Sequence, residues 1–343
     1  MSTSSSFATA SAVTPVTIVE NAATPTTTAS PAAKHGLKVA TYNVDQLNDA
    51  KWEFITKKFL LCAEPVHLLF LTETKRQPPE LTNWFKQVKT NYDWIINSHN
   101  PTRYHGVSLL YSKSLSVENI ENIIKEQIQD CPVRSDCNDK KGSAAIGRIV
   151  GVSVNQSFFL VGMYVPNAGH QEPAKLEYRT KRWDPAVYKL LNHLKTMKPV
   201  LWLGDLNIAP SEEDVTHPSE MKQYGGFTKE ERENFSTFLS TPISTVTSTS
   251  TTTDMKSSDG KSPHSKKQWV DVFRHMYPNA VQYTWRGRIP KQNNKTKNNM
   301  IRRQMRLDHM IASHDLVPHV RFIEIDSEPE LSDHCPLVLQ IDL

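Results

Sequence analysis

Several apolar runs of the sequence are followed by acid or amide residues, and in one case by a histidine, that could bind a metal ion or a phosphate. They are Asn43, Asp45, Glu73, Asp205, Asn207, Asp308, Asp333 and His334. Strand ends of a layered α/β fold converge on one rim, where ligands usually bind. Carboxylates gathered there repel each other unless a hard cation neutralises them, and an oxygen-rich set without thiolates suits Mg²⁺ better than zinc. The pattern therefore predicts a magnesium site, with Mn²⁺ as a substitute.

Each of these residues also has an ordinary structural explanation. A lone Asp or Asn after a strand is more often a turn former or a helix cap than a ligand. Glu73 is the sharpest case, because it ends the apolar run LLFLTET, is a poor turn residue and is costly to desolvate without a partner. The joint pattern, rather than any single residue, indicates catalysis.

His334 needs an acid partner if it is to carry charge. Asp333 precedes it directly, and adjacent residues in an extended chain point to opposite faces. We therefore predict that Asp308, on a separate strand, orients the imidazole and favours the imidazolium. Without such a partner, His334 is best explained as a hydrogen-bonded structural histidine.

Strand-like and helix-like runs alternate along the part of the chain that carries these residues. The predicted strands are 37–44, 67–74, 106–112, 146–154, 158–165, 200–207, 307–312 and 336–343, and the predicted helices are 51–62, 174–197 and 228–239. The last helix opens on a capping-box pattern of Thr228 with Glu231. This alternation predicts the α/β or α+β class.

Two segments of low complexity are present, one before the predicted domain and one within it. Residues 1–36 hold six Ser and eight Thr against two charged residues, which predicts a disordered tail. A second Ser- and Thr-rich stretch at about 241–268 is interpreted as a surface insertion, because motif-bearing sequence resumes after it. The remainder of 37–343 fits one catalytic domain.

Composition excludes some classes of protein and permits others. No apolar run approaches the roughly 18 residues of a membrane span, so no membrane segment is expected. The net charge of +4 permits a polyanionic partner without proving one. The cysteines at 62, 131, 137 and 335 lack CxxC pairing and are interpreted as reduced thiols of an intracellular protein, a disulfide between Cys131 and Cys137 being the alternative.

A series of motifs adds a family resemblance that covers 37–343. The series is TYNVDQLN, LTETK, YHGVSLLYS, GRIVGV, YVPNAG, LEYRTKRWD, LWLGDLNIA, GGFTKEER, DVFRHMYP, RLDHMIAS and LSDHCPL. In this order it resembles the exonuclease III class of apurinic/apyrimidinic (AP) endonucleases, of the eukaryotic AP endonuclease 1 type, within the endonuclease/exonuclease/phosphatase superfamily. The resemblance implies a four-layered α/β sandwich, with two sheets flanked by helices and the site at one rim.

The resemblance also implies an activity and a metal site. The activity is Mg²⁺-dependent hydrolysis of the DNA backbone 5′ to abasic sites, as in base excision repair, together with 3′ to 5′ exonuclease or 3′ end-trimming activity. Asp45 and Glu73 are implied to bind the metal with support from Asn43. The wider set of implied metal contacts is Asp45, Glu73, Asp205, Asn207, Asp333 and His334, with Asp333 at a second or shifting position.

The remaining implied roles concern the attacking water and the phosphate. Asp205 orients or deprotonates the water and Asn207 holds the scissile phosphate, while Asp308 orients His334 toward a phosphate oxygen. Tyr164 and Asn167 face the phosphate as well, and Lys75 is a basic supporting group. Whether Asp205 or His334 is the general base stays open; we expect Asp205 beside the water and His334 as electrostatic support.

The sugar pocket departs from the family pattern. Met305 stands where the eukaryotic enzymes have a Trp, and Trp285 aligns with a Phe, so Trp285, Met305 and Leu307 are the expected walls. His170 replaces an Arg, and segment 128–145 is longer than expected. Strict preference for a base-less nucleotide is therefore in doubt, and the balance of endonuclease and exonuclease activity stays open.

A run of basic residues indicates the kind of molecule that the protein binds. Residues 286–306 contain eight Lys or Arg and no acid, and a run beside a phosphodiesterase site favours a nucleic-acid clamp over a merely solvated face. The expected partner is double-stranded DNA, abasic or 3′-blocked, bound by a monomer. The nucleus is the expected compartment; a mitochondrial presequence is the weaker alternative, because the tail contains no Arg.

Other functions remain as alternatives. One is another branch of the superfamily that acts on RNA or on inositol or lipid phosphates, and another is an inactive relative that only binds DNA. The motifs RLDHMI, YVPNAG and LEYRTKRWD favour the DNA-repair branch, and the presence of every required acid disfavours an inactive protein.

Overall fold

Apolar residues on both faces of the central strands bury the middle of two β-sheets. In strand β2 (Leu68–Thr72), Leu68 and Phe70 belong to the core between the sheets, whereas Leu69 and Leu71 pack toward a helical layer. This two-residue period is what a strand with two covered faces requires. The computed structural model describes residues 36–98, 105–128, 147–241, 268–290, 300–328 and 331–343. The predicted tail and insertion lie outside the described residues, apart from Gly36, Thr241 and Gln268.

Two mixed six-stranded sheets form the centre of the described part of the chain. The first has the order β13-β14-β1-β2-β4-β3, and the second has the order β5-β6-β7-β8-β12-β9. The first contains β1 Leu37–Asn43, β2, β3 Tyr92–Asn97, β4 Val107–Ser112, β13 Val320–Ile325 and β14 Leu337–Ile341. The second contains β5 Val117–Asn119, β6 Ile149–Val154, β7 Phe158–Tyr164, β8 Val200–Asp205, β9 Trp269–Asp271 and β12 Asp308–Ser313.

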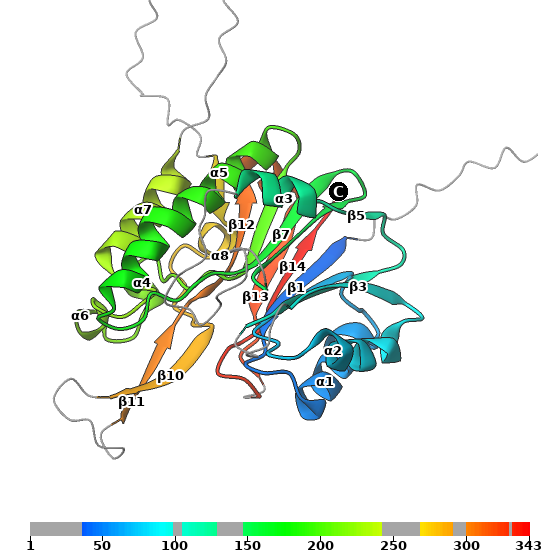
Figure 1. Cartoon of the computed structure of the whole chain (residues 1–343), viewed down its shortest axis with the longest axis horizontal. Coiled ribbons are helices and arrows are strands. Elements are labelled where there is room, and N and C mark those ends of the chain that lie inside the picture. The colour runs from blue at the N-terminus through cyan, green and yellow to red at the C-terminus, as the bar shows by residue number, and fades with distance from the viewer. Residues whose placement is uncertain (1–35, 99–104, 129–146, 242–267, 291–299, 329–330) are drawn as a thin grey trace, which may run out of the picture. The chain divides into compact units, whose positions relative to one another are not determined.

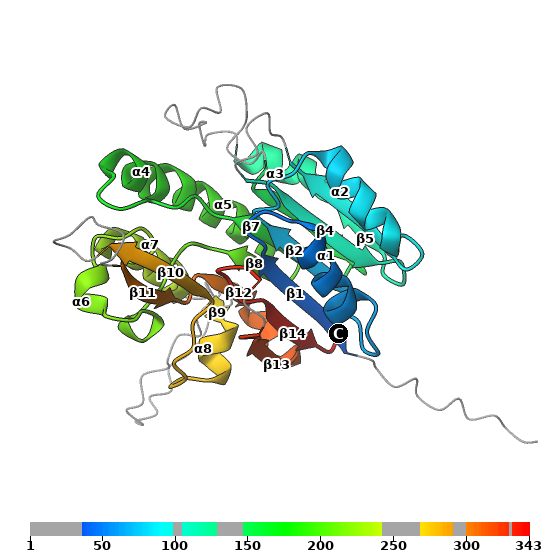
Figure 2. The same ribbon diagram turned by 90° about the horizontal axis from the view of Figure 1, so that it is seen from below.

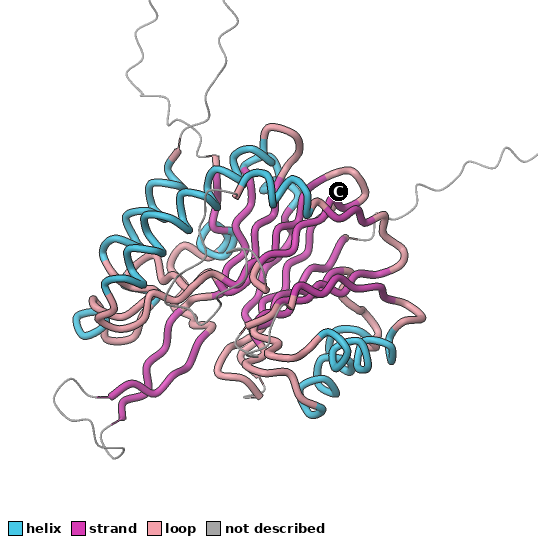
Figure 3. Tube along the Cα trace, in the orientation of Figure 1, coloured by secondary structure: helices cyan, strands magenta, loops and turns pink. Residues whose placement is uncertain are grey.

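Helices cover the outer face of each sheet (Figures 1 and 2). Helices α1 (Asp49–Ile55) and α2 (Pro78–Phe85) pack on the first sheet through a core that includes Trp52 and Phe85. Helices α5 (Asp184–Lys195) and α7 (Lys229–Ser240) pack on the second sheet. Figure 3 shows the strands enclosed by helices on both sides. The predicted four-layered α/β sandwich is confirmed.

Shorter elements complete the layers. These are the π-helices η1 Thr56–Leu60 and η3 Arg179–Trp183, the 3₁₀ segments η2 Lys86–Val88, η4 Glu212–Asp214 and η6 His314–His319, and the helices α3 Glu121–Gln127, α4 Pro173–Tyr178, α6 Pro218–Met221 and α8 Val272–Met276. The single helix predicted at 174–197 is therefore wrong in one respect, since η3 interrupts it. Among the described helices, none is long and apolar enough to cross a membrane.

A two-stranded ribbon stands off the two sheets (Figure 1). It consists of β10 Trp285–Pro290 and β11 Met300–Met305, paired antiparallel. The sequence shows this segment as a basic run, without the apolar alternation that predicts strands. The ribbon begins and ends beside two other segments of the domain, because Trp285 forms a bridge with His334 and Met305 forms one with Val215.

The directions of the strands decide which of their ends lie at the same rim of the sheets. Strands β1 and β2 are parallel, and so are β7 and β8, whereas β14 and β12 run antiparallel to their neighbours β1 and β8. The carboxyl ends of the parallel strands therefore share one rim with the amino ends of β12 and β14. In the second sheet, Asp205 pairs directly with Asp308 and with Tyr164.

Candidate active site

A cavity of about 290 Å³ opens at this rim. Most of the predicted site residues line it, namely Glu73, Tyr164, Asn167, Asp205, Asn207, Trp285, Met305, Leu307, Asp333 and His334. Asn43 and Asp308 contact these lining residues from behind, and Lys75 joins Asp45 to Glu73. The fold thus gathers residues from both sheets around one space.

Asn43 links the acids of the two sheets. Its buried amide Nδ2 donates to Glu73 Oε1 at 3.0 Å and to Asp205 Oδ2 at 2.9 Å. Asn43 belongs to β1, whereas Asp205 ends β8 in the other sheet. One amide therefore holds two carboxylates within reach of a common ligand.

His334 and Asp308 form a buried pair. His334 Nδ1 lies 2.7 Å from Asp308 Oδ2, and both side chains are almost inaccessible. Burial alone would lower the pKa of His334, but the Asp308 carboxylate overcomes this effect and raises it to about 10. Nδ1 is then the donor, and the imidazole carries a positive charge at neutral pH. The neighbouring Asp333 instead accepts a hydrogen bond from Trp285 Nε1 at 2.9 Å.

Asp205 lies at the bottom of the site, where ionisation is costly. Burial and the nearby Asp308 carboxylate raise the pKa of Asp205 to about 8. Ligand atoms of Asp205, Asp308 and His334 all lie within 4.8 Å of one another, and Asp308 Oδ1 has no hydrogen-bond partner. Buried acids this close, with an unpartnered oxygen, fit a divalent cation.

Asp45 and Glu73 form the acidic pair of the first sheet. Lys75 Nζ lies 2.7 Å from Asp45 Oδ1 and 2.6 Å from Glu73 Oε2. Burial would raise the pKa of Glu73, but Lys75 outweighs it and lowers that pKa. The ammonium between the two carboxylates shows that this pair accommodates a positive charge, as a metal site requires.

Strained backbone marks the same residues. Asp45, Glu73 and Asn207 have φ angles of 36°, 50° and 47°, in the left-handed region that residues with a Cβ rarely adopt. Such outliers persist when surrounding contacts hold them, and they gather at functional sites. Lys51 provides one such contact, because its buried Nζ donates to the carbonyls of Val44 and Asp45 at 2.6 and 2.7 Å.

Amides line the opposite side of the cavity. Asn167 Nδ2 donates to Asn207 Oδ1 at 2.9 Å, and Asn207 Nδ2 donates to the carbonyl of Val165 at 2.8 Å. Burial, followed by the charge of Glu73, raises the pKa of Tyr164 far above its usual value, so its hydroxyl remains a donor. These groups offer neutral hydrogen-bond donors and acceptors to an anion in the cavity.

The remaining wall of the cavity is apolar. Met221, Met305 and Leu307 are buried in one cluster, and Trp285 packs against it. This places the predicted sugar-pocket residues together at one side of the acids and amides. Across the mouth, His170 stacks on Tyr224, with their rings 3.9 Å apart and tilted by 11°.

Comparison with known proteins identifies the family. A family model described as "Endonuclease/Exonuclease/phosphatase family" matches residues 40–334. The chain belongs to the endonuclease/exonuclease/phosphatase family. The family expected from the motifs is thus confirmed, and the acids described above lie within the matched residues.

Relatives within this family have names that point to DNA. A DNA-(apurinic or apyrimidinic site) endonuclease of Dictyostelium discoideum is 27% identical, over 90% of this chain and 71% of that protein. An exodeoxyribonuclease of Streptococcus pneumoniae is also 27% identical, over 90% of this chain and all of that protein. The solved structure of an AP endonuclease from Archaeoglobus fulgidus shares the fold, with a TM-score of 0.60, 19% identity and coverage of 90% of this chain and 100% of that chain.

Buried charges beside this family's site escaped sequence analysis. Arg306 was counted in the basic run, yet its guanidinium is 1% exposed and pairs with Asp214 at 2.7 Å and Asp271 at 2.8 Å. Arg303 is also buried and pairs with Glu220. The interpretation of the whole run as a clamp is therefore wrong for these two residues, because neither can face DNA. The only signal in the sequence was the position of Arg306 directly before Leu307 and Asp308.

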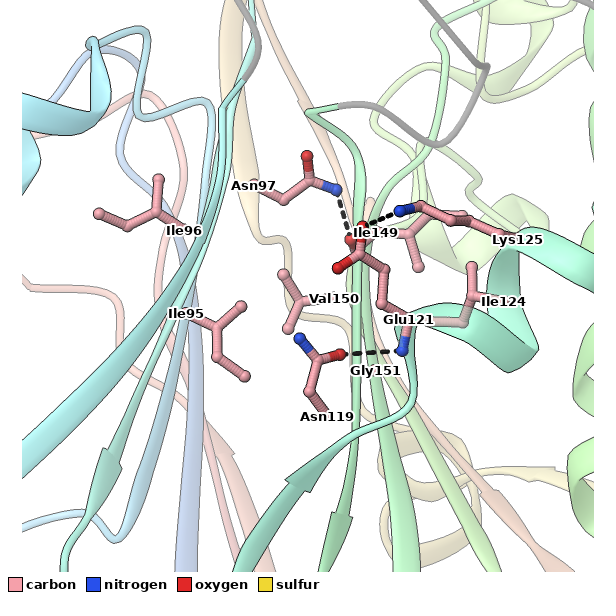
Figure 4. A pocket seen from close by; sticks show the side chains of 10 residues that line it. All are labelled: Ile95, Ile96, Asn97, Asn119, Glu121, Ile124, Lys125, Ile149, Val150 and Gly151. Carbon is pink, nitrogen blue, oxygen red and sulfur yellow. Dashed lines mark hydrogen bonds and ion pairs between the residues drawn. The ribbon is translucent and has the colours of Figure 1, made fainter.

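Another cavity, of about 110 Å³, lies between the edge strands of the two sheets (Figure 4). Its charged lining residues, Glu121 and Lys125 of α3, pair with each other at 2.5 Å. Asn97 Nδ2 donates to the carbonyl of Ile149 at 2.7 Å. Since its lining residues satisfy one another in this way, this cavity offers no competing set of catalytic groups.

Proposed function

We propose that this protein is a Mg²⁺-dependent DNA phosphodiesterase that cuts the backbone 5′ to abasic sites and also removes nucleotides or blocking groups from 3′ ends. The observation that carries the proposal is the single cavity in which Glu73, Asp205 and His334 face an apolar wall. The acids and the imidazolium suit a phosphate, and the apolar wall suits a sugar. The names of the relatives support DNA as the polymer.

Asp45 and Glu73 would hold the Mg²⁺ ion, with Asn43 fixing the position of Glu73. When bound, the ion supplies positive charge to the non-bridging oxygens of the phosphate. Asp333 at the mouth and the buried Asp205 and Asn207 would serve a second or shifting position, which His334 joins only as a neutral imidazole. Mn²⁺ is the expected substitute. Lys75 supports this side as the cation already beside the two acids.

The other residues act on the water and the phosphate. Asp205, which a bound cation would keep ionised, accepts a proton from, or orients, the attacking water. Asn207, Asn167 and Tyr164 donate hydrogen bonds to the phosphate. His334, held as an imidazolium by Asp308, offers Nε2 to a phosphate oxygen. In-line attack increases the negative charge on these oxygens, so each donor binds the transition state more strongly than the ground state. No covalent intermediate with the enzyme is required.

The experiment that tests this function compares three end-labelled duplexes, each with Mg²⁺ and with EDTA. One carries a single abasic-site analogue, one is intact and one has a recessed 3′ end. Mg²⁺-dependent incision at the abasic analogue is the expected result, with slower shortening of the recessed end. Shortening without incision would make the protein a trimming exonuclease, and absence of any cleavage would refute the proposal and direct attention to RNA or phospholipid substrates.

The ribbon provides a second contact with DNA. Arg288 and Arg302 are register partners on β10 and β11, and the ribbon is attached directly beside Trp285 and Met305 of the cavity. Neutralising phosphates releases counterions, so the logarithm of the binding constant falls linearly with the logarithm of the salt concentration. We expect Arg288→Ala with Arg302→Ala to make this slope shallower by about two, roughly one for each lost phosphate contact.

Fluorescence anisotropy of a labelled abasic duplex in EDTA, at several salt concentrations, measures this slope. Lys229→Ala is the matched control, because Lys229 is an exposed cation on α7 that pairs with Glu233. An unchanged slope in the double variant would show that the ribbon does not bind the backbone.

The tail is expected to be dispensable for catalysis. Deleting residues 1–36 should leave the cleavage rate of the abasic duplex unchanged within about twofold, because such a composition does not build a packed site. A large loss of activity in the truncated protein would show that the tail takes part. We further propose that the protein acts as a monomer in the nucleus, with the mitochondrion as the alternative compartment.

A further inference from the structure

A buried arginine connects the two loops that carry the amides of the site. Arg179 is 3% exposed, and its guanidinium donates to three backbone carbonyls. Nη1 reaches Pro166 O at 3.0 Å and Asn207 O at 3.3 Å, while Nη2 reaches Leu206 O at 2.9 Å. The first carbonyl lies in the loop after β7, and the other two lie in the loop after β8.

These loops hold the phosphate side of the cavity. Asn167 follows Pro166 directly. Asn207 follows Leu206 directly, and its own backbone is strained, with a φ angle of 47°. The Asn167 and Asn207 side chains are themselves hydrogen-bonded at 2.9 Å, and the Asn207 backbone N–H donates to Asp205 Oδ1 at 3.0 Å. A shift of either loop would therefore move both amides and the acid beside them.

Contacts within and beside the helical segment that contains Arg179 fix the position of its guanidinium. Arg179 opens the π-helical turn η3, a rare local geometry that is frequent at functional sites. Arg179 Nε donates to Asp184 Oδ1 at 2.6 Å, which fixes the plane of the guanidinium. The charge of Glu231 also favours the arginine cation, and Glu231 accepts hydrogen bonds from Gly226 N and Thr228 Oγ1. A buried cation with a carboxylate partner and three carbonyl acceptors compensates its own desolvation.

We propose that Arg179 is a positioning residue that keeps Asn167, Asn207 and Asp205 in register for phosphodiester cleavage. The proposal rests on the function proposed above. Among the residues that line the cavity, Arg179 is hydrogen-bonded to Asn207, and it reaches Asn207 through the backbone carbonyl. Its effect is therefore on geometry rather than on charge at the phosphate. A misplacement of about 1 Å can cost on the order of 100-fold in rate.

The test uses Arg179→Met, Arg179→Lys and, as a control, Arg182→Met, which removes an exposed cation from the same π-helical turn. In Arg179→Met we expect kcat on the abasic duplex to fall on the order of 100-fold. The Mg²⁺ concentration for half-maximal rate should change much less than kcat, because Asp45 and Glu73, which would hold the first ion, belong to the other sheet. Arg179→Lys should be intermediate, since one ammonium cannot span three carbonyls. Arg182→Met should resemble the parent.

A double-mutant cycle separates positioning from general destabilisation. If Arg179 acts through the amides, Asn207→Ala should cost about tenfold less in the Arg179→Met background than in the parent. Additive losses, or full activity of Arg179→Met, would overturn the proposal. Should Arg179→Met fail to fold, the same cycle with Arg179→Lys carries the test, because the lysine keeps a charge for Asp184.

Amide hydrogen exchange provides a measurement that does not depend on activity. In the Arg179 variants, backbone amides of 165–169 and 205–209 should exchange faster, whereas those of 44–47 and 73–75 should not change. Unchanged exchange in both loops would refute the positioning role even if the parent cleaves DNA. Conversely, faster exchange in a protein that cleaves no DNA would retain the role of Arg179 and refute only the proposed function.

Discussion

Glu73→Gln is expected to abolish Mg²⁺-dependent cleavage of the abasic duplex while DNA binding is largely retained. The substitution keeps the shape of the side chain, and its amide can still meet Asn43, but it removes the negative charge that faces Asp45 and Lys75. Loss of the charge that holds the cation should cost several kcal/mol of transition-state stabilisation, or on the order of 1,000-fold in rate. DNA binding depends mainly on phosphate contacts made by cations elsewhere.

Single-turnover cleavage and anisotropy in EDTA measure the two properties separately. Glu53→Gln is the matched control, because Glu53 lies on α1, is exposed and pairs only with Lys57 as an i,i+4 neighbour. Such an exposed pair contributes little, so this variant should cleave like the parent. Full activity of Glu73→Gln would remove Glu73 from the metal site.

Asp205→Asn is expected to lower the cleavage rate by about 100- to 10,000-fold, the range attributed to a positioned general base. An asparagine can still accept a hydrogen bond from Asn43, but it cannot accept a proton from water. Because the substitution removes a proton acceptor and not only a candidate metal ligand, excess Mg²⁺ should not restore the rate. A loss smaller than about tenfold would assign the general base to another residue.

The same substitution should not weaken the fold, which distinguishes a chemical defect from a structural one. The pKa of Asp205 is raised to about 8 by burial and by Asp308. When the pKa of an acid is higher in the folded than in the unfolded protein, the folded protein becomes less stable as the pH rises from the ordinary pKa toward the raised one. Asp205→Asn removes this loss, so in EDTA at pH 8 its unfolding midpoint in urea should equal or exceed that of the parent. A clearly lower midpoint would show that the hydrogen bonds that Asp205 accepts from Asn43 and Asn207 stabilise the fold by more than its buried charge costs.

Strand ends were predictable because the hydrophobic pattern that defines a strand is local. The runs before Glu73 and Asp205 are buried along their whole length, and every residue in them except Thr72 is apolar. A charged residue at the end of such a run must leave the core at the rim, whatever the neighbouring strand is. The pairing of Asp308 with His334 also followed from local geometry, because Asp333 could not turn toward the adjacent imidazole.

The partners of buried charges could not be predicted in this way. Arg306 looked like one member of a solvated basic run, but its acceptor Asp214 lies 92 positions away, and only the packing of η4 against β11 and β12 brings them together. Arg179 bonds carbonyls 13 and 28 positions away, and backbone carbonyls have no signature in the sequence.

The sequence alone determined the order of the strands' buried runs, the identity of the acids at their ends and the family to which the chain belongs. The tertiary structure alone decided that one amide, Asn43, joins the acids of two sheets, that Lys75 lies between Asp45 and Glu73, and that Arg179 ties two loops. The physical reason is range: periodic burial is a property of a few neighbouring residues, whereas the stability of a buried charge depends on groups that only the folded chain brings within hydrogen-bonding distance.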